Sequence, residues 1–570
     1  MRRYVLSSGI LLMLLSVSSA KNPLCYSEVS LSKQVHEFLR NRIEAAGIPP
    51  KLSVGEDSIR ASVMLPRFYE RRSYRSAWIN ENGPTFQAKS LINKIKEAEH
   101  EGLRPEDYHL VKIESIMIEI GRIQKSKTPL NPRILVDIEL LLTDSFLIYG
   151  SHLVSGKVNP ESIDAEWFAN RREADMVQVI EAALDSNQIS ESLKNLLPTH
   201  TVYKRLKSAL AQYLETLTEG GWGTIPDGQK IQKGDRDNRV IALRHRLVVS
   251  KDLPILEKND EDLFDVGLEE AVRRFQWRHG LDADGVVGNM TLAALNVPVE
   301  ERVRQIELNM ERWRWLPQDL GSKHIIVNIA NFELDVKENQ EQVMTMRVVV
   351  GKQYRTTPVF SAAMTYLVLS PYWHIPPTLA VQDKLPLIRK DVSYLEKQKI
   401  RVFQGWGAET KEVDPAVVDW SRITAKNFGF RLRQDPGPLN ALGQVKFMFP
   451  NGFNVYLHDT PSKELFEKSI RAFSSGCIRI EKPIELAEYL LMGDPRWTKE
   501  RILAAIAKGS EETIILRDPI PVHLLYWTAW ADEDGLVHFR DDIYRRDKRL
   551  YEALKERPPA AFQDEQGKLL

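Results

Sequence analysis

Tyr456-Leu457-His458-Asp459, followed after a gap by Ser474-Ser475-Gly476-Cys477-Ile478-Arg479, is the stretch that decides which fold and chemistry to expect. Fifteen residues separate His458 from Ser474. A free cysteine has a pKa of about 8.5 and is mostly thiol at neutral pH, but a nearby imidazole can take its proton and hold the ion pair. Gly476 lets backbone come close to a substrate carbonyl, whose oxyanion would face N–H groups of the turn. The pattern indicates a nucleophilic Cys477 with His458 as its base.

Asp459 directly follows His458 on a predicted strand, so its side chain should point to the opposite face of the sheet. A backbone carbonyl is therefore expected to orient the second imidazole nitrogen. Two readings without catalysis stay open. Both residues can belong to an ordinary core, and Cys477 can form a disulfide with Cys25 in an oxidising compartment.

The sequence around this stretch alternates with a period of two from about residue 321, which indicates strands. Pro450-Asn451-Gly452 predicts a hairpin, because Asn-Gly supplies the positive φ angles of a type I′ turn. Residues 377–430 are rich in Leu and Lys and predict a helical insertion into a β domain. Beyond Ile325, Val327 and Ile329, strands are expected at 344–350, 364–369, 445–449, 453–457, 513–516 and 523–528.

The part of the chain that precedes the β domain is predicted to be helical. Val35, Leu39 and Ile43 recur at helical spacing, and a Gly-rich stretch at 219–223 marks a boundary. Ile134, Ile138, Leu141, Leu142 and Phe146 show the same spacing. We find no catalytic spacing in this region, which favours a helical scaffold.

Residues 235–298 form a separate compact unit with two helix faces and a glycine stop at Gly280. Its string resembles the three-helix peptidoglycan-binding domain, which implies wall binding, although such domains also serve as spacers. The resemblance rests on Phe275-Gln276, Gly280-Leu281, Asp284-Gly285-Val286-Val287-Gly288, Thr291 and Leu295.

Composition excludes several classes of protein. The 570 residues contain 78 Lys+Arg and 78 Asp+Glu, and this balance argues against a nucleic-acid partner. Two cysteines exclude a disulfide scaffold and a Cys-rich zinc module, and the His residues lack metal-ligand spacing, so no metal or cofactor is expected. Arg2-Arg3, a short apolar run and Ser18-Ser19-Ala20 are the parts of a cleaved signal peptide over 1–20. An uncleaved inner-membrane anchor is the alternative.

The His458–Cys477 combination resembles the catalytic domain of the L,D-transpeptidase family, the YkuD-type domain, whose motif is His, a gap and Ser/Thr-His-Gly-Cys. Ser475 stands where many members have a second His, and Arg479 where many have Asn; both fit the large periplasmic, YcbB-like branch. The same branch is indicated by Val350-Gly351-Lys352, Thr357-Pro358-Val359-Phe360, Pro371-Tyr372-Trp373-His374-Ile375-Pro376-Pro377, Phe430-Arg431-Leu432-Arg433-Gln434-Asp435-Pro436-Gly437 and Thr528-Ala529-Trp530.

The resemblance implies a multidomain α+β protein. The expected parts are a helical scaffold over 21–230, the peptidoglycan-binding-like domain over 235–298 and a mostly-β catalytic domain over 321–518. The insertion over 377–430 corresponds to a substrate-capping subdomain. Residues 519–570 form a C-terminal extension without an assigned role.

The resemblance also implies residue roles. Cys477 would attack a peptidoglycan stem tetrapeptide, release D-Ala and pass the acyl group to a second stem as a 3→3 cross-link. The carbonyl of Ser474 would orient His458, and the backbone of Tyr456, Gly476 and Cys477 would line the oxyanion site. Arg479 and Trp373 would contact substrate, and carbapenems would be covalent inhibitors.

Other acceptors keep the same Cys477 and His458. Water would make the enzyme an L,D-carboxypeptidase or endopeptidase, and a protein lysine would make it a lipoprotein-anchoring acyl transferase. A hypothesis outside the enzyme class is a wall-binding adaptor whose catalytic fold is inert. Further partners could be other cell-wall synthesis proteins.

Overall fold

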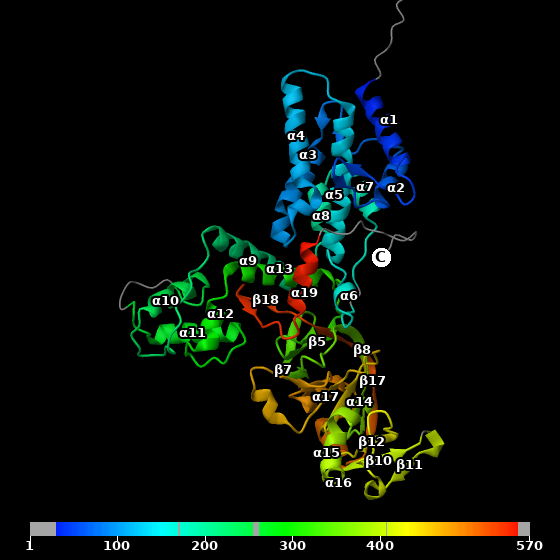
Figure 1. The fold of residues 1–570 in the computed structure, drawn as a ribbon, viewed down its shortest axis with the longest axis vertical. Coiled ribbons are helices and arrows are strands. Elements are labelled where there is room, and N and C mark those ends of the chain that lie inside the picture. The colour runs from blue at the N-terminus through cyan, green and yellow to red at the C-terminus, as the bar shows by residue number, and fades with distance from the viewer. Residues whose placement is uncertain (1–29, 169–170, 255–260, 406, 557–570) are drawn as a thin grey trace, which may run out of the picture.

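The computed structural model describes residues 30–168, 171–254, 261–405 and 407–556. A helical N-terminal region, a three-helix unit and a mostly-β domain with its own inserted subdomain follow one another (Figure 1), which confirms the predicted α+β architecture. Among the described residues, no helix is long and apolar enough to cross a membrane. The predicted signal peptide and Cys25 lie outside these residues.

The N-terminal region is built around α5 (Pro132–Ser155), which is buried at every position from Ile138 to Ser155. Asn131 caps this helix by accepting the N–H of Arg133, and Pro132 occupies its first turn, where a missing N–H does no harm. A helix that is apolar around its circumference requires neighbours on all sides. They include α1 (Leu31–Glu44), α2 (Met64–Arg71), α3 (Phe86–Lys96), α4 (Leu110–Lys125), α7 (Met176–Asp185) and strand β1 (Ser53–Val54). Helix α8 (Ile189–Lys194) packs on α3 and α7, and the region also contains short strands β2 (Asp57–Ser58), β3 (Ile79–Asn80) and β4 (Gly83–Pro84).

The three-helix unit has the predicted helices and turn. Gly280, with φ +67°, follows the end of the second helix, and the side chain of Gln276 binds the next turn through Asp284, Gly285 and Val286. The helices are α10 (Arg239–Val249), α11 (Val266–Arg278) and α12 (Asn289–Leu295).

Two helices connect these parts to the β domain. Helix α13 (Val299–Arg314) packs along α9 (Thr201–Thr218), and both contribute side chains to the same core as the sheet. Helix α19 (Arg546–Lys555) lies against α13 and α6 (Pro160–Ile163), between the scaffold and the sheet (Figure 1).

The β domain is one nine-stranded sheet in the order β15-β7-β16-β14-β13-β8-β17-β5-β6. Strand β7 also pairs with β6, so the sheet closes on itself. Strand β17 continues beyond residue 518, the predicted domain end. The strands are β5 (Lys323–Asn328), β6 (Glu333–Glu338), β7 (Glu341–Gly351), β8 (Phe360–Leu369), β13 (Val445–Met448), β14 (Leu457–His458), β15 (Ala472–Ser474), β16 (Ile478–Ile480) and β17 (Glu512–Leu525), followed by the hairpin β18 (Ala529–Ala531) and β19 (Val537–Phe539); α17 (Pro483–Leu490) and α18 (Lys499–Ala507) precede β17.

The insertion contains the expected helices together with a four-stranded sheet that the sequence did not predict. Its α-helices end at Lys397, Lys399 has φ +53°, and the next residues form a strand because Ile400 and Val402 alternate into a small core. The subdomain contains α14 (Pro377–Leu379), α15 (Leu385–Lys390), α16 (Ser393–Lys397) and a sheet of β11 (Lys411–Val413), β10 (Ile400–Gln404), β12 (Phe430–Gln434) and β9 (Trp373–Ile375).

The predicted type I′ hairpin at Asn451-Gly452 is also wrong. Strands β13 and β14 do pair, but neither Asn451 nor Gly452 has a positive φ angle, and residues 453–456 are not in a strand. Instead the Asn451 side chain accepts the N–H groups of Phe453 and Val455 and donates to the carbonyl of Phe449. Side-chain hydrogen bonds of asparagine replace the tight backbone turn.

This loop gives a prediction that separates the two turn geometries. Gly452→Ala should be tolerated with an unchanged or slightly higher melting temperature, because a Cβ at Gly452 meets nothing within 4 Å and its φ is not positive. Alanine at a compatible position stabilises by about 0.4–1 kcal/mol through the unfolded state. Thermal unfolding of the full chain checks this, and a clear loss of stability would favour the type I′ turn.

Candidate active site

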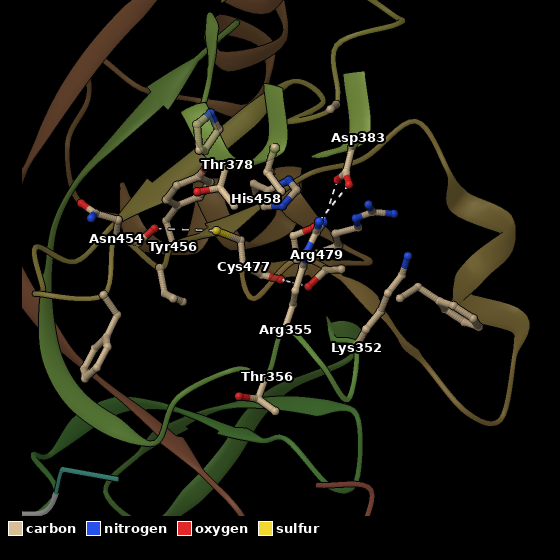
Figure 2. A pocket seen from close by; sticks show the side chains of 18 of the residues that line it. Lys352, Arg355, Thr356, Thr378, Asp383, Asn454, Tyr456, His458, Cys477 and Arg479 are labelled. Atoms are coloured by element: carbon tan, nitrogen blue, oxygen red, sulfur yellow. Dashed lines mark hydrogen bonds and ion pairs between the residues drawn. The ribbon is translucent and has the colours of Figure 1, made fainter. Parts of the chain in front are cut away.

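The pairing of β14 with β16 brings the two sequence motifs together. Leu457 lies opposite Ile478 and His458 opposite Arg479 in a parallel register. Leu457 and Ile478 are buried in the core. Because side chains alternate along a strand, the neighbouring residues point to the other face. There Tyr456, His458, Cys477 and Arg479 line one cavity of 1160 Å³ (Figure 2).

His458 is buried and held in one tautomer. Its Nδ1 is 2.5 Å from the carbonyl oxygen of Asp459. A carbonyl can only accept, so Nδ1 carries the hydrogen and Nε2 keeps its lone pair. The Asp459 carboxylate binds Lys463 and the N–H of Gln444, away from the imidazole, as the strand alternation predicts.

The prediction that the Ser474 carbonyl orients His458 is wrong, although a backbone carbonyl does so. Ser474 belongs to β15, which pairs with β7, and its carbonyl accepts the N–H of Lys352 at 3.0 Å. The sheet therefore occupies that oxygen, and the carbonyl of Asp459 takes the position beside the ring.

Burial favours the neutral forms of both Cys477 and His458. Burial, together with the positive charge of Arg479, lowers the pKa of His458 to about 3. Burial also raises the pKa of the Cys477 thiol, against the stabilisation of the thiolate by Tyr456, Lys446 and Arg479. These shifts disfavour the expected thiolate–imidazolium pair.

The Ser474 hydroxyl holds the turn from inside. It accepts the N–H of Gly476 at 3.1 Å and donates to the carbonyl of Cys477 at 2.5 Å. Gly476 has φ +115°, a conformation that favours glycine. Its N–H is occupied, which corrects the prediction that this group faces an oxyanion.

The inserted subdomain is tied to the turn by Arg355, which the sequence did not single out. Arg355 donates to both carboxylate oxygens of Asp383, at 2.7 and 2.8 Å, and to the Ser475 hydroxyl at 3.0 Å (Figure 2). Asp383 lies in the insertion, far along the chain from Ser475, so only the tertiary fold reveals that Arg355 joins the two. Trp373 lines the same cavity from β9, with the Lys384 ammonium 5.2 Å from its ring centre.

The cavity is rich in cations. The Nε of Arg479 is buried and has no hydrogen-bond partner among the described residues. Lys446 was missed, yet it pairs with His458 across β13 and β14, so strand alternation could have found it. The cationic residues of the lining are Lys352, Arg355, Lys384, Lys446, Arg479, Arg546 and Arg549. Their number fits a ligand that carries carboxylates.

Three family models match the chain in the order of its structural parts. Residues 64–210 match a scaffold domain, and residues 236–295 match a "Putative peptidoglycan binding domain". Residues 322–497, which contain His458 and Cys477, match the L,D-transpeptidase catalytic domain.

A "Putative L,D-transpeptidase" of Haemophilus influenzae is 34% identical over 247 residues, 43% of this chain and 49% of that protein. The chain thus spans about half the length of this curated relative. Among solved structures, an L,D-transpeptidase of Xylanimonas cellulosilytica is 15% identical and covers 53% of this chain and 99% of that one, with a TM-score of 0.15. One of Stackebrandtia nassauensis is 12% identical and covers 53% and 96%, with a TM-score of 0.20.

The raised thiol pKa predicts the reactivity of Cys477. Its alkylation by iodoacetamide should increase with pH beyond the ordinary thiol range of about 8.5, because burial keeps the thiol protonated at pH 7. Lys446→Met should slow alkylation at pH 7 several-fold, since the lysine charge stabilises the thiolate, whereas Lys446→Arg should not. Mass spectrometry of the Cys477 peptide measures both. A plateau already reached at pH 7 would contradict the neutral pair.

The carbonyl-held imidazole predicts unequal effects of two neighbouring substitutions. His458→Ala should lower the rate of thiol acylation by roughly 100- to 10 000-fold, the usual contribution of a general base. Asp459→Asn keeps the backbone carbonyl and should lower the acylation rate by less than about tenfold. The same substitution of a catalytic-triad aspartate lowers the rate by roughly 10 000-fold. Equal losses in single-turnover acylation would show that the carboxylate itself acts on the ring.

Proposed function

We propose that this chain, which belongs to the L,D-transpeptidase family, joins peptidoglycan stem peptides through 3→3 cross-links in the periplasm. The observation that supports this most directly is the placement of Cys477 and an imidazole with a free Nε2 in one cavity. This pair can form and resolve a thioester without a cofactor.

In the proposed reaction, Sγ of Cys477 attacks the carbonyl of the third residue of a tetrapeptide stem. The thiol proton moves to Nε2 of His458, and the carbonyl oxygen becomes an oxyanion. Collapse of this intermediate breaks the bond to the terminal D-Ala, whose amine takes the proton from His458. The amine of a second stem then attacks the thioester, and Cys477 recovers its proton through His458.

The electrostatics of the cavity suit this substrate. Stem peptides carry carboxylates, and the unpartnered Nε of Arg479 can bind one beside the reacting carbon. Trp373 supplies an apolar wall, and Arg355 holds the inserted subdomain over the turn. A covered cavity disfavours water and so favours an amine as the acceptor.

The three-helix unit is proposed to hold the enzyme on peptidoglycan. The match of residues 236–295 to a putative peptidoglycan binding domain supports this.

The product pattern tests the proposal. Full-length protein incubated with disaccharide-tetrapeptide should release D-Ala and form cross-linked dimers, and Cys477→Ala should do neither. Mass spectrometry of the products separates the alternatives. Tripeptide and D-Ala without dimers would indicate a carboxypeptidase, transfer to a protein lysine would indicate an anchoring enzyme, and an inert wild type would leave a wall-binding adaptor.

A further inference from the structure

The Ser474–Cys477 turn is also held from its buried side, by a residue that does not line the cavity. Thr357 has no exposed surface and donates its hydroxyl hydrogen to the carbonyl of Gly476 at 2.8 Å. The same hydroxyl accepts the N–H of Gly351 at 3.0 Å. Both contacts fix the Thr357 hydroxyl and, through it, the plane of the Gly476–Cys477 peptide.

The orientation of this peptide decides where the N–H of Cys477 points. The bond is trans, because the cis bond of the described residues is Ile48–Pro49. In a trans peptide the C=O and N–H groups point in opposite directions. Since the Gly476 carbonyl faces the buried Thr357, the Cys477 N–H faces the other side, where Cys477 lines the cavity. The structure gives this N–H no hydrogen-bond acceptor in the ranges it describes.

We infer that Thr357 is a positioning residue that aims the Cys477 N–H at the oxyanion of the acyl transfer; this inference rests on the proposed function. Thr357 does not touch the substrate. It fixes the N–H of Cys477, whereas the N–H of Gly476 is already bound by the Ser474 hydroxyl. A donor held in place before the reaction stabilises the oxyanion without reorganisation.

The C-terminal segment holds Thr357 in turn, which gives that segment a role. The Tyr544 hydroxyl donates to the carbonyl of Gly351 at 2.6 Å and accepts the N–H of Thr357 at 3.3 Å. Arg546 donates to the carbonyl of Thr357 at 3.2 Å and is paired with the buried Asp164 of the N-terminal region at 2.8 Å. The peptide at Cys477 is thus braced by three distant parts of the chain.

The test compares Thr357→Val, which removes the hydroxyl at nearly constant shape, with Thr357→Ser, which retains it. The rate of thioester formation with tetrapeptide and with a carbapenem should fall about 10- to 100-fold in Thr357→Val. Complete loss of one oxyanion donor lowers a rate by roughly 100- to 1000-fold, and a donor that is only displaced should lower it by less. Thr357→Ser should recover to within about threefold of wild type. Alkylation of Cys477 by iodoacetamide builds no oxyanion and should be unchanged in both variants.

Thr143→Val is the matched control, because that buried hydroxyl also donates to a backbone carbonyl, of Glu139, and accepts the indole N–H of Trp78, far from the turn. It should lower the melting temperature and leave acylation unchanged. If Thr357→Val does not fold, Tyr544→Phe removes the hydroxyl that supports Thr357 and should give a smaller loss of acylation with unchanged alkylation.

Wild-type acylation in Thr357→Val, or an equal loss of acylation and alkylation in the folded variants, would overturn the inference. A wild-type enzyme that is alkylated but never acylated by tetrapeptide would overturn the proposed function instead. The two failures are therefore distinct.

Discussion

Buried charge on α13 is the constraint on which the arrangement of the domains depends. Arg314 and Glu311 form a fully buried ion pair at 2.7 Å, and Arg312 pairs with Asp547 of α19 at 2.6 Å. Glu311 also accepts the N–H of Val158, and Arg314 donates to the carbonyl of Glu101. Removing one partner of such a pair typically costs about 3–5 kcal/mol. The scaffold, the sheet and the C-terminal helix are thereby fixed against a common helix.

This arrangement matters for the proposed chemistry because the cavity that holds Cys477 and His458 is not made by the β domain alone. Its lining includes Asp164 and Glu166 from the N-terminal region, Thr378 and Asp383 from the insertion and Arg549 from α19. The α13 network fixes the N-terminal region and α19 against the sheet. The closed sheet then fixes the other wall, where His458 ends β14 and Cys477 directly precedes β16.

The fold class, the three-helix unit and most strands of the sheet could be predicted because they rest on periodic patterns. Gly280 ends its helix with φ +67°, as a glycine stop predicts. The failures have a common cause. Asn451-Gly452 has the composition of a tight turn, but the bonds of the Asn451 side chain to Phe449 and Val455 decide the loop. Ile400–Gln404 follows helices in the insertion yet becomes a strand because β12 is available to pair with it.

The residue pattern alone predicts that Cys477 and His458 share one site, and the structure places both in one cavity, with His458 at the end of β14 and Cys477 directly before β16. The pattern also predicted that Asp459 would turn its carboxylate away from His458. Only the tertiary structure decided which carbonyl holds the imidazole, that burial favours the neutral forms of both groups, and which distant segments brace the turn. Burial and pairing depend on what other parts of the chain place around a residue, and spacing along one stretch carries no information about them.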